Sequence, residues 1–113
     1  MPGRTETLNG TELYFEIHGA GEPLLLLHGF SGSSQDWTAA IAEYQNQFQL
    51  IVPDLRGHGR SSILTRPFRH QDAAADIIAL LDHLKINACK GLGVSCGGNV
   101  LLHTILSLAG VAS

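Results

Sequence analysis

The chain has 113 residues, of which 44% are hydrophobic and 15% are charged, and its net charge is −3. This composition predicts one soluble globular domain over residues 1–113 and argues against a disordered chain or a nucleic-acid-binding protein, which would favour a basic face. The N-terminal residues Met1 to Glu6 form no signal-peptide core, and the most apolar segment, Val100 to Ala112, is too short to span a bilayer, so we expect a cytoplasmic protein with no membrane partner.

The N-terminal quarter of the chain predicts a β-hairpin followed by a buried strand. Residues 5–8 and 11–18 flank Asn9-Gly10, which is the strongest short hairpin signal. Four consecutive leucines, residues 24–27, predict a strand that is buried on both faces, as in a parallel sheet. A glycine-containing loop over residues 28–33 follows this strand.

The next segment predicts a helix and a second buried strand. A helix is expected from about Ser34 to Phe48, because four large apolar residues recur on one helical face: Trp37, Ile41, Tyr44 and Phe48. We expect Trp37 and Tyr44 to be core residues. Residues 50–52 predict a strand that ends at Pro53. A charged loop with glycine turns then extends from Asp54 to about residue 69.

The last third of the chain predicts helix, strand and helix. Apolar residues share one face over residues 71–84, a weak strand is expected from Ala88 to Leu92, and a mostly apolar helix is expected over Cys96–Leu108. Strands that alternate with helices indicate an α/β fold with right-handed crossovers and a parallel sheet. Functional groups should therefore gather at the carboxyl ends of the strands.

The segment Gly93-Val94-Ser95-Cys96-Gly97-Gly98 lies at the end of the last predicted strand. A Gly-x-Ser-x-Gly pattern between a strand and a helix is typical of a nucleophile elbow, a tight turn that exposes a serine. Glycine is needed on either side of the serine, because the strained turn leaves no room for a Cβ. The pattern alone is common in a glycine-rich chain, and its position between a strand and a helix is what makes it specific.

A second motif, His28-Gly29-Phe30, directly follows the strand of leucines. A tetrahedral intermediate needs two backbone N–H donors aimed at its oxyanion. We expect one from Cys96, the residue after the serine, and the other from this loop. Gly29 would keep the backbone open to the substrate.

Three segments together resemble the N-terminal half of an α/β-hydrolase. These are the strand end at Leu26 to Phe30, the loop from Pro53 to Ser61 and the elbow around Ser95, which occur in family order and at family-like spacing. The resemblance implies that Ser95 is the nucleophile of a serine hydrolase acting on small carboxylic esters, that Phe30 and Cys96 supply the oxyanion N–H groups, and that no metal or organic cofactor is used. It also disfavours relatives that use aspartate at the elbow, such as dehalogenases and epoxide hydrolases.

The chain is about half the size of the members of that family. The resemblance therefore implies a truncated fold without the later strands, the lid, or the acid and histidine of the usual triad. Truncation would leave the strand from Ala88 to Leu92 at a sheet edge and uncover the helix Cys96–Leu108. Because unpaired strand edges invite pairing, we expect a homo-oligomer assembled through these two elements.

Several candidates stay open for the base that would activate Ser95. His103 follows Ser95 by eight residues on one helix, about 12 Å of rise, which is too far for a hydrogen bond. His28 and His58 are possible substitute bases that line the site, although loop bracing or packing is the simpler role for each. Asp54 is expected to cap its loop or to orient a histidine.

Two cysteines, Cys89 and Cys96, form neither a disulfide framework nor a zinc site and are read as free thiols. Cys96 is a weaker alternative nucleophile, because its side chain would point away from that of Ser95. Two further functions remain open: an inactive fragment that acts as a scaffold or interaction module, and a small-molecule-binding module that holds a carboxylate or carbonyl in the oxyanion loop.

Overall fold

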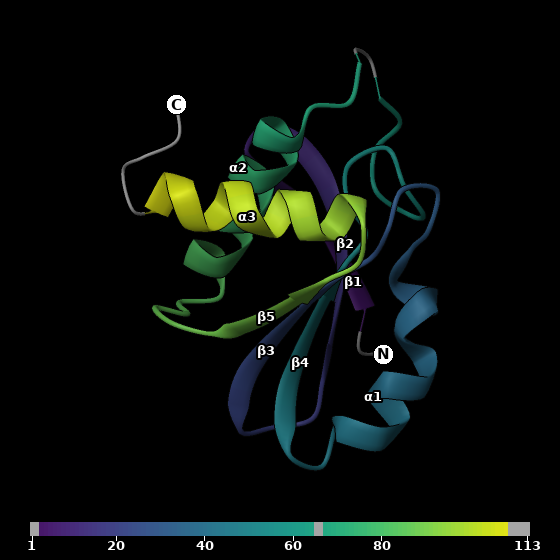
Figure 1. Cartoon of the computed structure of the whole chain (residues 1–113), viewed down its shortest axis with the longest axis vertical. Coiled ribbons are helices and arrows are strands. Elements are labelled where there is room, and N and C mark those ends of the chain that lie inside the picture. Colours follow the sequence, from purple (N-terminus) through teal and green to yellow (C-terminus); the bar gives the residue numbers. More distant parts are fainter. Residues whose placement is uncertain (1–2, 65–66, 109–113) are drawn as a thin grey trace.

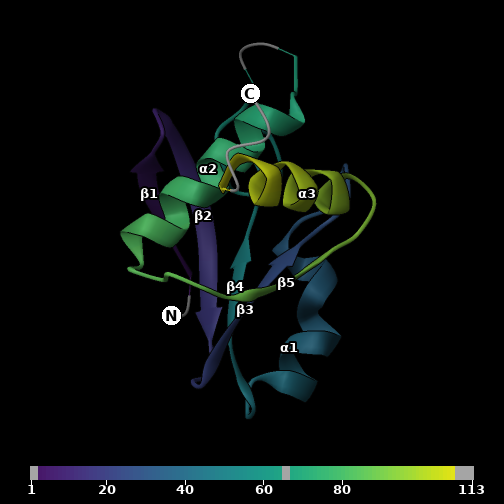
Figure 2. The ribbon, with the colours of Figure 1, turned by 60° about the vertical axis from the view of Figure 1, so that its left-hand side comes forward.

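The middle layer of the molecule is a five-stranded mixed sheet with the strand order β1-β2-β4-β3-β5. Figure 1 shows it in a computed structural model that describes residues 3–64 and 67–108. Within these residues, the helices lie on both faces of the sheet: α1 (Thr38–Tyr44) on one, and α2 (His70–His83) with α3 (Cys96–Leu108) on the other (Figure 2). This is the α/β architecture that the sequence predicts.

The N-terminal hairpin is confirmed. Strands β1 (Gly3–Leu8) and β2 (Thr11–His18) pair antiparallel, and the turn between them holds Asn9 and Gly10 at φ values of 53° and 73°. Positive φ at both central positions is the geometry that asparagine and glycine tolerate best. The hairpin joins the rest of the sheet through β2, which pairs antiparallel with β4.

The predicted parallel strands are also confirmed. Strand β3 (Glu22–Leu27) lies between β4 (Phe48–Pro53) and β5 (Lys90–Gly93) and pairs parallel with both. All three therefore end at the same edge of the sheet, where the loop after Leu27, the loop after Pro53 and the Ser95 turn begin. This edge is where the predicted site residues meet.

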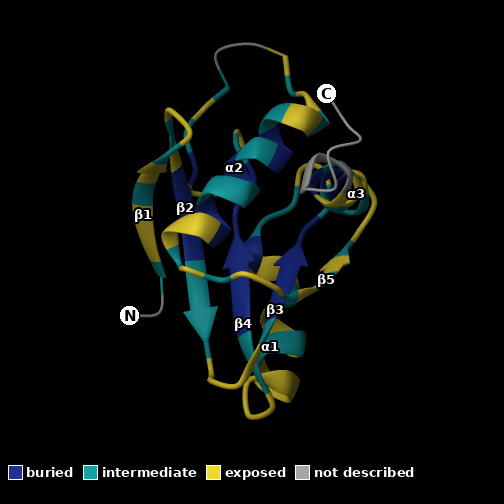
Figure 3. Cartoon of the chain, turned by 90° about the vertical axis from the view of Figure 1, so that its left-hand side faces the viewer, coloured by how far each residue is buried: buried dark blue, intermediate teal, exposed yellow. Residues whose placement is uncertain are grey.

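Alternation along β3 divides the core into two layers. Leu25 and Leu27 join a cluster with the buried faces of α2 (His70–His83) and α3 (Cys96–Leu108), whereas Leu24 and Leu26 join a smaller cluster that packs against Trp37. Successive side chains on a strand point to opposite faces, so a run of leucines serves both layers. Figure 3 shows the resulting burial on the central strands, with more exposure on β1 and β5.

The helix expected from about Ser34 to Phe48 is wrong in its extent. The segment forms a 3₁₀ turn (Ser34–Trp37) and a short helix, α1 (Thr38–Tyr44), and Phe48 begins β4 opposite Glu22. Phe48 reaches the same small cluster from the strand, so its helical spacing from Trp37 is coincidental. Tyr44 is not a core residue, because 43% of it is exposed.

Strand β5 is shorter than expected and begins at Lys90 rather than Ala88. Its pairing with β3 starts at Leu24, opposite Lys90, and ends at Leu27, opposite Gly93. Among the described residues, no helix is long and apolar enough to cross a membrane.

Candidate active site

Ser95 lies in the turn between β5 and α3 and is exposed, with φ at +52°. A Cβ on Gly93 would lie 2.5 Å from the backbone of Gly97, and a Cβ on Gly97 would collide with the carbonyls of Leu27 and His28. A non-glycine residue at positive φ is strained and is held only by its surroundings. The elbow predicted from the sequence is thus present in its geometry, and these contacts require glycine at both positions.

Gly98, by contrast, has room for a side chain. A Cβ there would meet the Gly93 carbonyl oxygen at 3.4 Å, which is ordinary contact, and its φ is not positive. Of the two neighbouring glycines at the start of α3, only Gly97 is sterically required. The pair therefore offers a matched comparison for testing the elbow.

The loop after β3 lies directly beside the elbow. A Cβ added to Gly29 would lie 3.9 Å from the Cβ of Ser95, and the Val94 N–H donates to the Leu27 carbonyl at 3.1 Å. A turn closed by the Gly32 N–H and the Gly29 carbonyl oxygen, 3.0 Å apart, holds Phe30 at its second position. Cys96 is the first residue of α3, where a backbone N–H has no acceptor within the helix. The two expected oxyanion donors thus belong to adjacent backbone segments.

His28 is buried, and both of its ring nitrogens have partners. Nε2 accepts the Leu55 N–H at 2.9 Å, and Nδ1 lies 2.7 Å from the Gly29 carbonyl oxygen. Only the neutral tautomer with a proton on Nδ1 satisfies both contacts. Burial lowers the pKa of His28 below its ordinary value, which is consistent with a neutral ring that braces two loops.

Asp54 connects the 3₁₀ turn Ser34–Trp37 to the loop after β4. One carboxylate oxygen accepts the Ser34 N–H at 2.6 Å and the other accepts the Arg60 N–H at 2.8 Å. Its backbone carbonyl accepts the Ser61 hydroxyl at 2.6 Å. The side chain is buried, and these contacts fit loop capping, the simpler of the two roles expected for it.

His58 lies in a group of aromatic rings beside the oxyanion loop. Its Nδ1 is 3.0 Å from the Arg56 carbonyl oxygen, and its ring centroid is 5.0 Å from that of His28 and 5.2 Å from that of Phe30. Phe68 completes the group, 5.6 Å from His58 and 6.0 Å from Phe30. Sequence reasoning did not single out Phe68, and only its position just before α2 hinted at a contact.

Three of the remaining histidines have partners of their own. His70 and His103 stack with ring centroids 5.9 Å apart, and Nε2 of His18 lies 2.8 Å from a Glu16 carboxylate oxygen. Within residues 3–64 and 67–108, no hydrogen bond joins Ser95 to an imidazole, and no three His, Cys, Asp or Glu side chains gather as a metal site. Burial raises the pKa of Cys96, which disfavours the thiolate and hence the alternative nucleophile.

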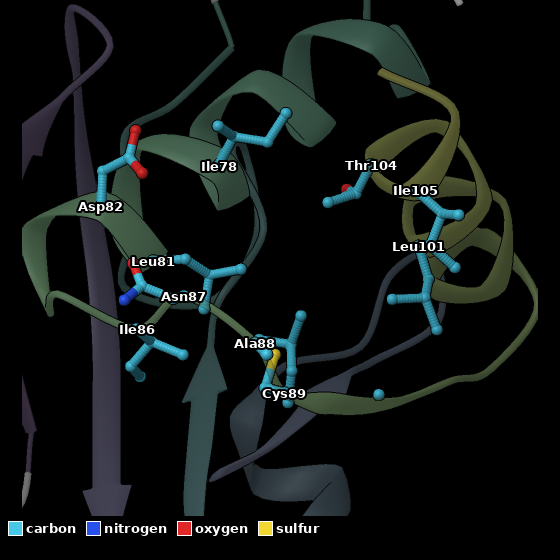
Figure 4. Close-up of a pocket in the computed structure, with 12 residues that line it drawn as sticks. Ile78, Leu81, Asp82, Ile86, Asn87, Ala88, Cys89, Leu101, Thr104 and Ile105 are labelled. Carbon is cyan, nitrogen blue, oxygen red and sulfur yellow. The ribbon is translucent and has the colours of Figure 1, made fainter. Parts of the chain in front are cut away.

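A cavity in the described part of the chain is separate from the elbow. It has a volume of about 360 Å³ and lies between α2, α3 and the segment that leads into β5 (Figure 4). Its walls are mainly apolar, with Leu81, Leu101 and Ile105 among them, and Asp82 and Asn87 add polar groups. None of the predicted site residues lines it.

The fold, the elbow and the adjacent glycine loop together define an α/β hydrolase. The sequence model of the α/β hydrolase fold family matches residues 22–107, and the chain belongs to this family. The resemblance noted from the sequence is therefore confirmed.

The individual similarities point to several hydrolases. The chain is 34% identical over 96 residues to a soluble epoxide hydrolase of Corynebacterium sp. strain C12, a match that covers 85% of the chain and 34% of that protein. It is 39% identical over 96 residues to 3-oxoadipate enol-lactonase 2 of Acinetobacter baylyi, with 83% and 36% covered. The ligand-free structure of the epoxide hydrolase CorEH superposes with a TM-score of 0.89 at 31% identity, over 93% of the chain and 37% of that structure. The chain thus spans about a third of the length of the relatives it matches.

Proposed function

We propose that Ser95 is the nucleophile of a hydrolase that cleaves small carboxylic esters, including cyclic ones. The observation that supports this most directly is the elbow, where an exposed serine sits at positive φ between two glycines that tolerate no side chain. A fold does not by itself imply a reaction, so the argument rests on this site. The enol-lactonase among the relatives cleaves a bond of the same chemical class, as its name states.

The chemistry requires two steps at Ser95. The serine Oγ attacks the ester carbonyl carbon as its proton passes to a base, and the oxyanion is held by the N–H groups of Phe30 and Cys96. The bond to the alcohol oxygen then breaks, and the alcohol leaves with the proton from the base. Water next attacks the acyl group on Ser95, which releases the carboxylic acid and restores the hydroxyl.

The residue at the elbow favours ester over epoxide chemistry. Two of the similar proteins are epoxide hydrolases, a class whose elbow is expected to hold aspartate. An aspartate attacks the epoxide through its carboxylate, whereas a serine hydroxyl is suited to acyl transfer. The nucleophilic atom proposed here is therefore the hydroxyl oxygen of Ser95, whereas in those relatives we expect a carboxylate oxygen.

His58 is the better of the two substitute bases within the described residues. Use of His28 as a base would break the hydrogen bond from the Leu55 N–H to its Nε2. For His58, a proton on Nδ1 donates to the Arg56 carbonyl oxygen and leaves Nε2 as the basic nitrogen. His58→Gln, which keeps a polar side chain of similar reach, is expected to lower Ser95-dependent hydrolysis by about a hundredfold, the usual contribution of a general base.

Hydrolysis of a short-chain p-nitrophenyl ester by the wild-type chain, compared with Ser95→Ala, tests the proposal. Ser62→Ala is the matched control, because that hydroxyl lies in the loop after β4 and accepts a hydrogen bond from the Glu12 N–H on β2. We expect activity in the wild type and the control and none in Ser95→Ala. An aryl fluorophosphonate followed by mass spectrometry should label Ser95; equal rates in all three proteins, together with no label on Ser95, would refute the assignment.

The cavity of Figure 4 supports a second candidate, the binding of a small apolar molecule. Its volume of about 360 Å³ falls within the range of ligand pockets, and its walls are mainly apolar. Ala88 lines this cavity, so Ala88→Phe should fill part of it. A ligand-dependent rise in melting temperature that survives Ser95→Ala and disappears in Ala88→Phe would favour this function over catalysis.

A further inference from the structure

Phe30 is a highly exposed aromatic side chain beside the candidate nucleophile. It is 64% exposed, and it follows Gly29, whose added Cβ would lie 3.9 Å from the Cβ of Ser95. Val94, which directly precedes Ser95 in the sequence, is also 54% exposed. The reacting hydroxyl therefore lies beside apolar surface that the chain itself leaves open to solvent.

Two other aromatic rings pack against the ring of Phe30. It meets His58 edge-on with centroids 5.2 Å apart and Phe68 edge-on with centroids 6.0 Å apart, and these two meet each other at 5.6 Å. Edge-to-face contacts at these distances are favourable. Three mutually perpendicular rings thus hold one another, and Phe30 keeps one open side.

The supporting rings are themselves fixed. His58 is buried, with its Nδ1 at 3.0 Å from the Arg56 carbonyl oxygen, and Phe68 also contacts His70 edge-on at 5.7 Å. The backbone of Phe30 is held by the turn that the Gly32 N–H closes on Gly29. The exposed ring is therefore preorganised, which lowers the entropy cost of placing a ligand against it.

We propose that Phe30, supported by Phe68 and His58, is a binding wall for an uncharged aromatic group of the substrate. This inference rests on the proposed ester hydrolysis at Ser95 and names its substrate class, esters with an aromatic ring close to the reacting carbonyl. A flat ring packs on Phe30 with the same geometry that Phe30 makes with its neighbours, whereas a short aliphatic chain gains only the burial of its surface.

Binding to the non-hydrolysing Ser95→Ala chain tests the wall without catalysis. The probe is methyl 4-fluorophenylacetate, followed by ¹⁹F NMR. The affinity of methyl cyclohexylacetate, the saturated counterpart of similar shape, is measured by its displacement of this probe. We expect the aromatic ester to bind more tightly than the saturated one. Phe30→Leu and Phe68→Leu in the same background should each weaken the aromatic ester about two- to tenfold, the range of an aromatic pair, and should remove most of its advantage.

Tyr44→Leu is the matched control, because it removes an exposed ring on α1, which covers the other face of the sheet. Its affinity should be unchanged, and thermal melting confirms that each variant folds. Equal affinity of the two esters, no binding, or the same loss in Tyr44→Leu would overturn the wall. If binding follows these expectations but hydrolysis is independent of Ser95, the wall stands and the proposed reaction fails; Ser95-dependent hydrolysis with no aromatic preference gives the opposite result.

Discussion

Replacement of Asp76 by alanine should cost a large part of the stability of the fold. Asp76 is 1% exposed on α2, and its carboxylate accepts two hydrogen bonds from Arg56, both at 2.7 Å, and one from the Asn9 side chain at 3.0 Å. These contacts join the hairpin turn, the loop after β4 and α2. The hydrogen bonds to Asp76 raise the pKa of Arg56 above its ordinary value. An arginine guanidinium is so basic that it stays charged even when this partner is removed.

The magnitude follows from the charge left behind. The Arg56 side chain is 11% exposed, and removal of one partner of a buried ion pair costs about 3–5 kcal/mol because the other charge is left without compensation. The total stability of such a domain is about 5–15 kcal/mol, so Asp76→Ala should be severely destabilised. The double variant Asp76→Leu, Arg56→Met removes both charges and should recover most of the loss.

Urea denaturation followed by the fluorescence of the single tryptophan, Trp37, measures this effect, because Trp37 packs against the small core cluster. At a slope of about 1.5 kcal/mol/M, the midpoint should fall by about 2–3 M. Glu22→Ala is the control: its ion pair with Lys90 is 3.0 Å long but largely exposed, and its loss should cost less than about 1 kcal/mol. Similar losses in Asp76→Ala and Glu22→Ala, or no recovery in the double variant, would refute the reasoning.

Three further predictions concern the elbow, His28 and the sheet edge. Gly97→Ala should abolish Ser95-dependent hydrolysis and lower the melting temperature, whereas Gly98→Ala should do neither, because only the first Cβ collides with backbone. Folding lowers the pKa of His28, so below about pH 6.5 the unfolded chain binds more protons than the folded chain. The contribution of His28 to the free energy of unfolding should therefore be fully present above that pH and be lost toward pH 5. Calorimetry should show a weaker dependence of stability on pH in His28→Asn. We also propose self-association through β5 and α3, because Leu92 at the edge strand is exposed; light scattering at micromolar concentration should show a species larger than a monomer that Leu92→Lys shifts toward the monomer.

Features of the fold that depend on neighbours in the sequence could be predicted. The hairpin at Asn9-Gly10 is an example, because positive φ at two consecutive residues is a demand that two residue types meet locally. The parallel direction of β3, β4 and β5 followed from strands that alternate with helices, although their order in the sheet did not. The error at Phe48 has the same origin, since a spacing of eleven residues from Trp37 fits a helical face whether or not the chain stays helical.

Features that depend on contacts between distant segments could not be predicted. Arg56 and Asp76 read as ordinary charged positions, and only the packing of α2 beside the loop after β4 brings them together. The same holds for Phe68, which reaches Phe30 across 38 positions of sequence, and for the Leu55 N–H that occupies His28. A sequence shows that such groups exist, but not which partner each one meets.

This contrast explains why a nucleophile is easier to assign than its base. The residues that mark an exposed serine lie within five consecutive positions, so the glycines around Ser95 identify the elbow from the sequence, even though Gly97 is required by the distant carbonyls of Leu27 and His28. The requirement for a base is a single imidazole nitrogen at hydrogen-bond distance, and composition alone does not distinguish among the six histidines in the sequence. The structure separates them by their partners: His28 is bound through both nitrogens, whereas His58 has one basic nitrogen left after its contact with Arg56. For that reason, a loss of hydrolysis in His58→Gln without a loss of stability would distinguish a chemical role from the packing role that its ring contacts also support.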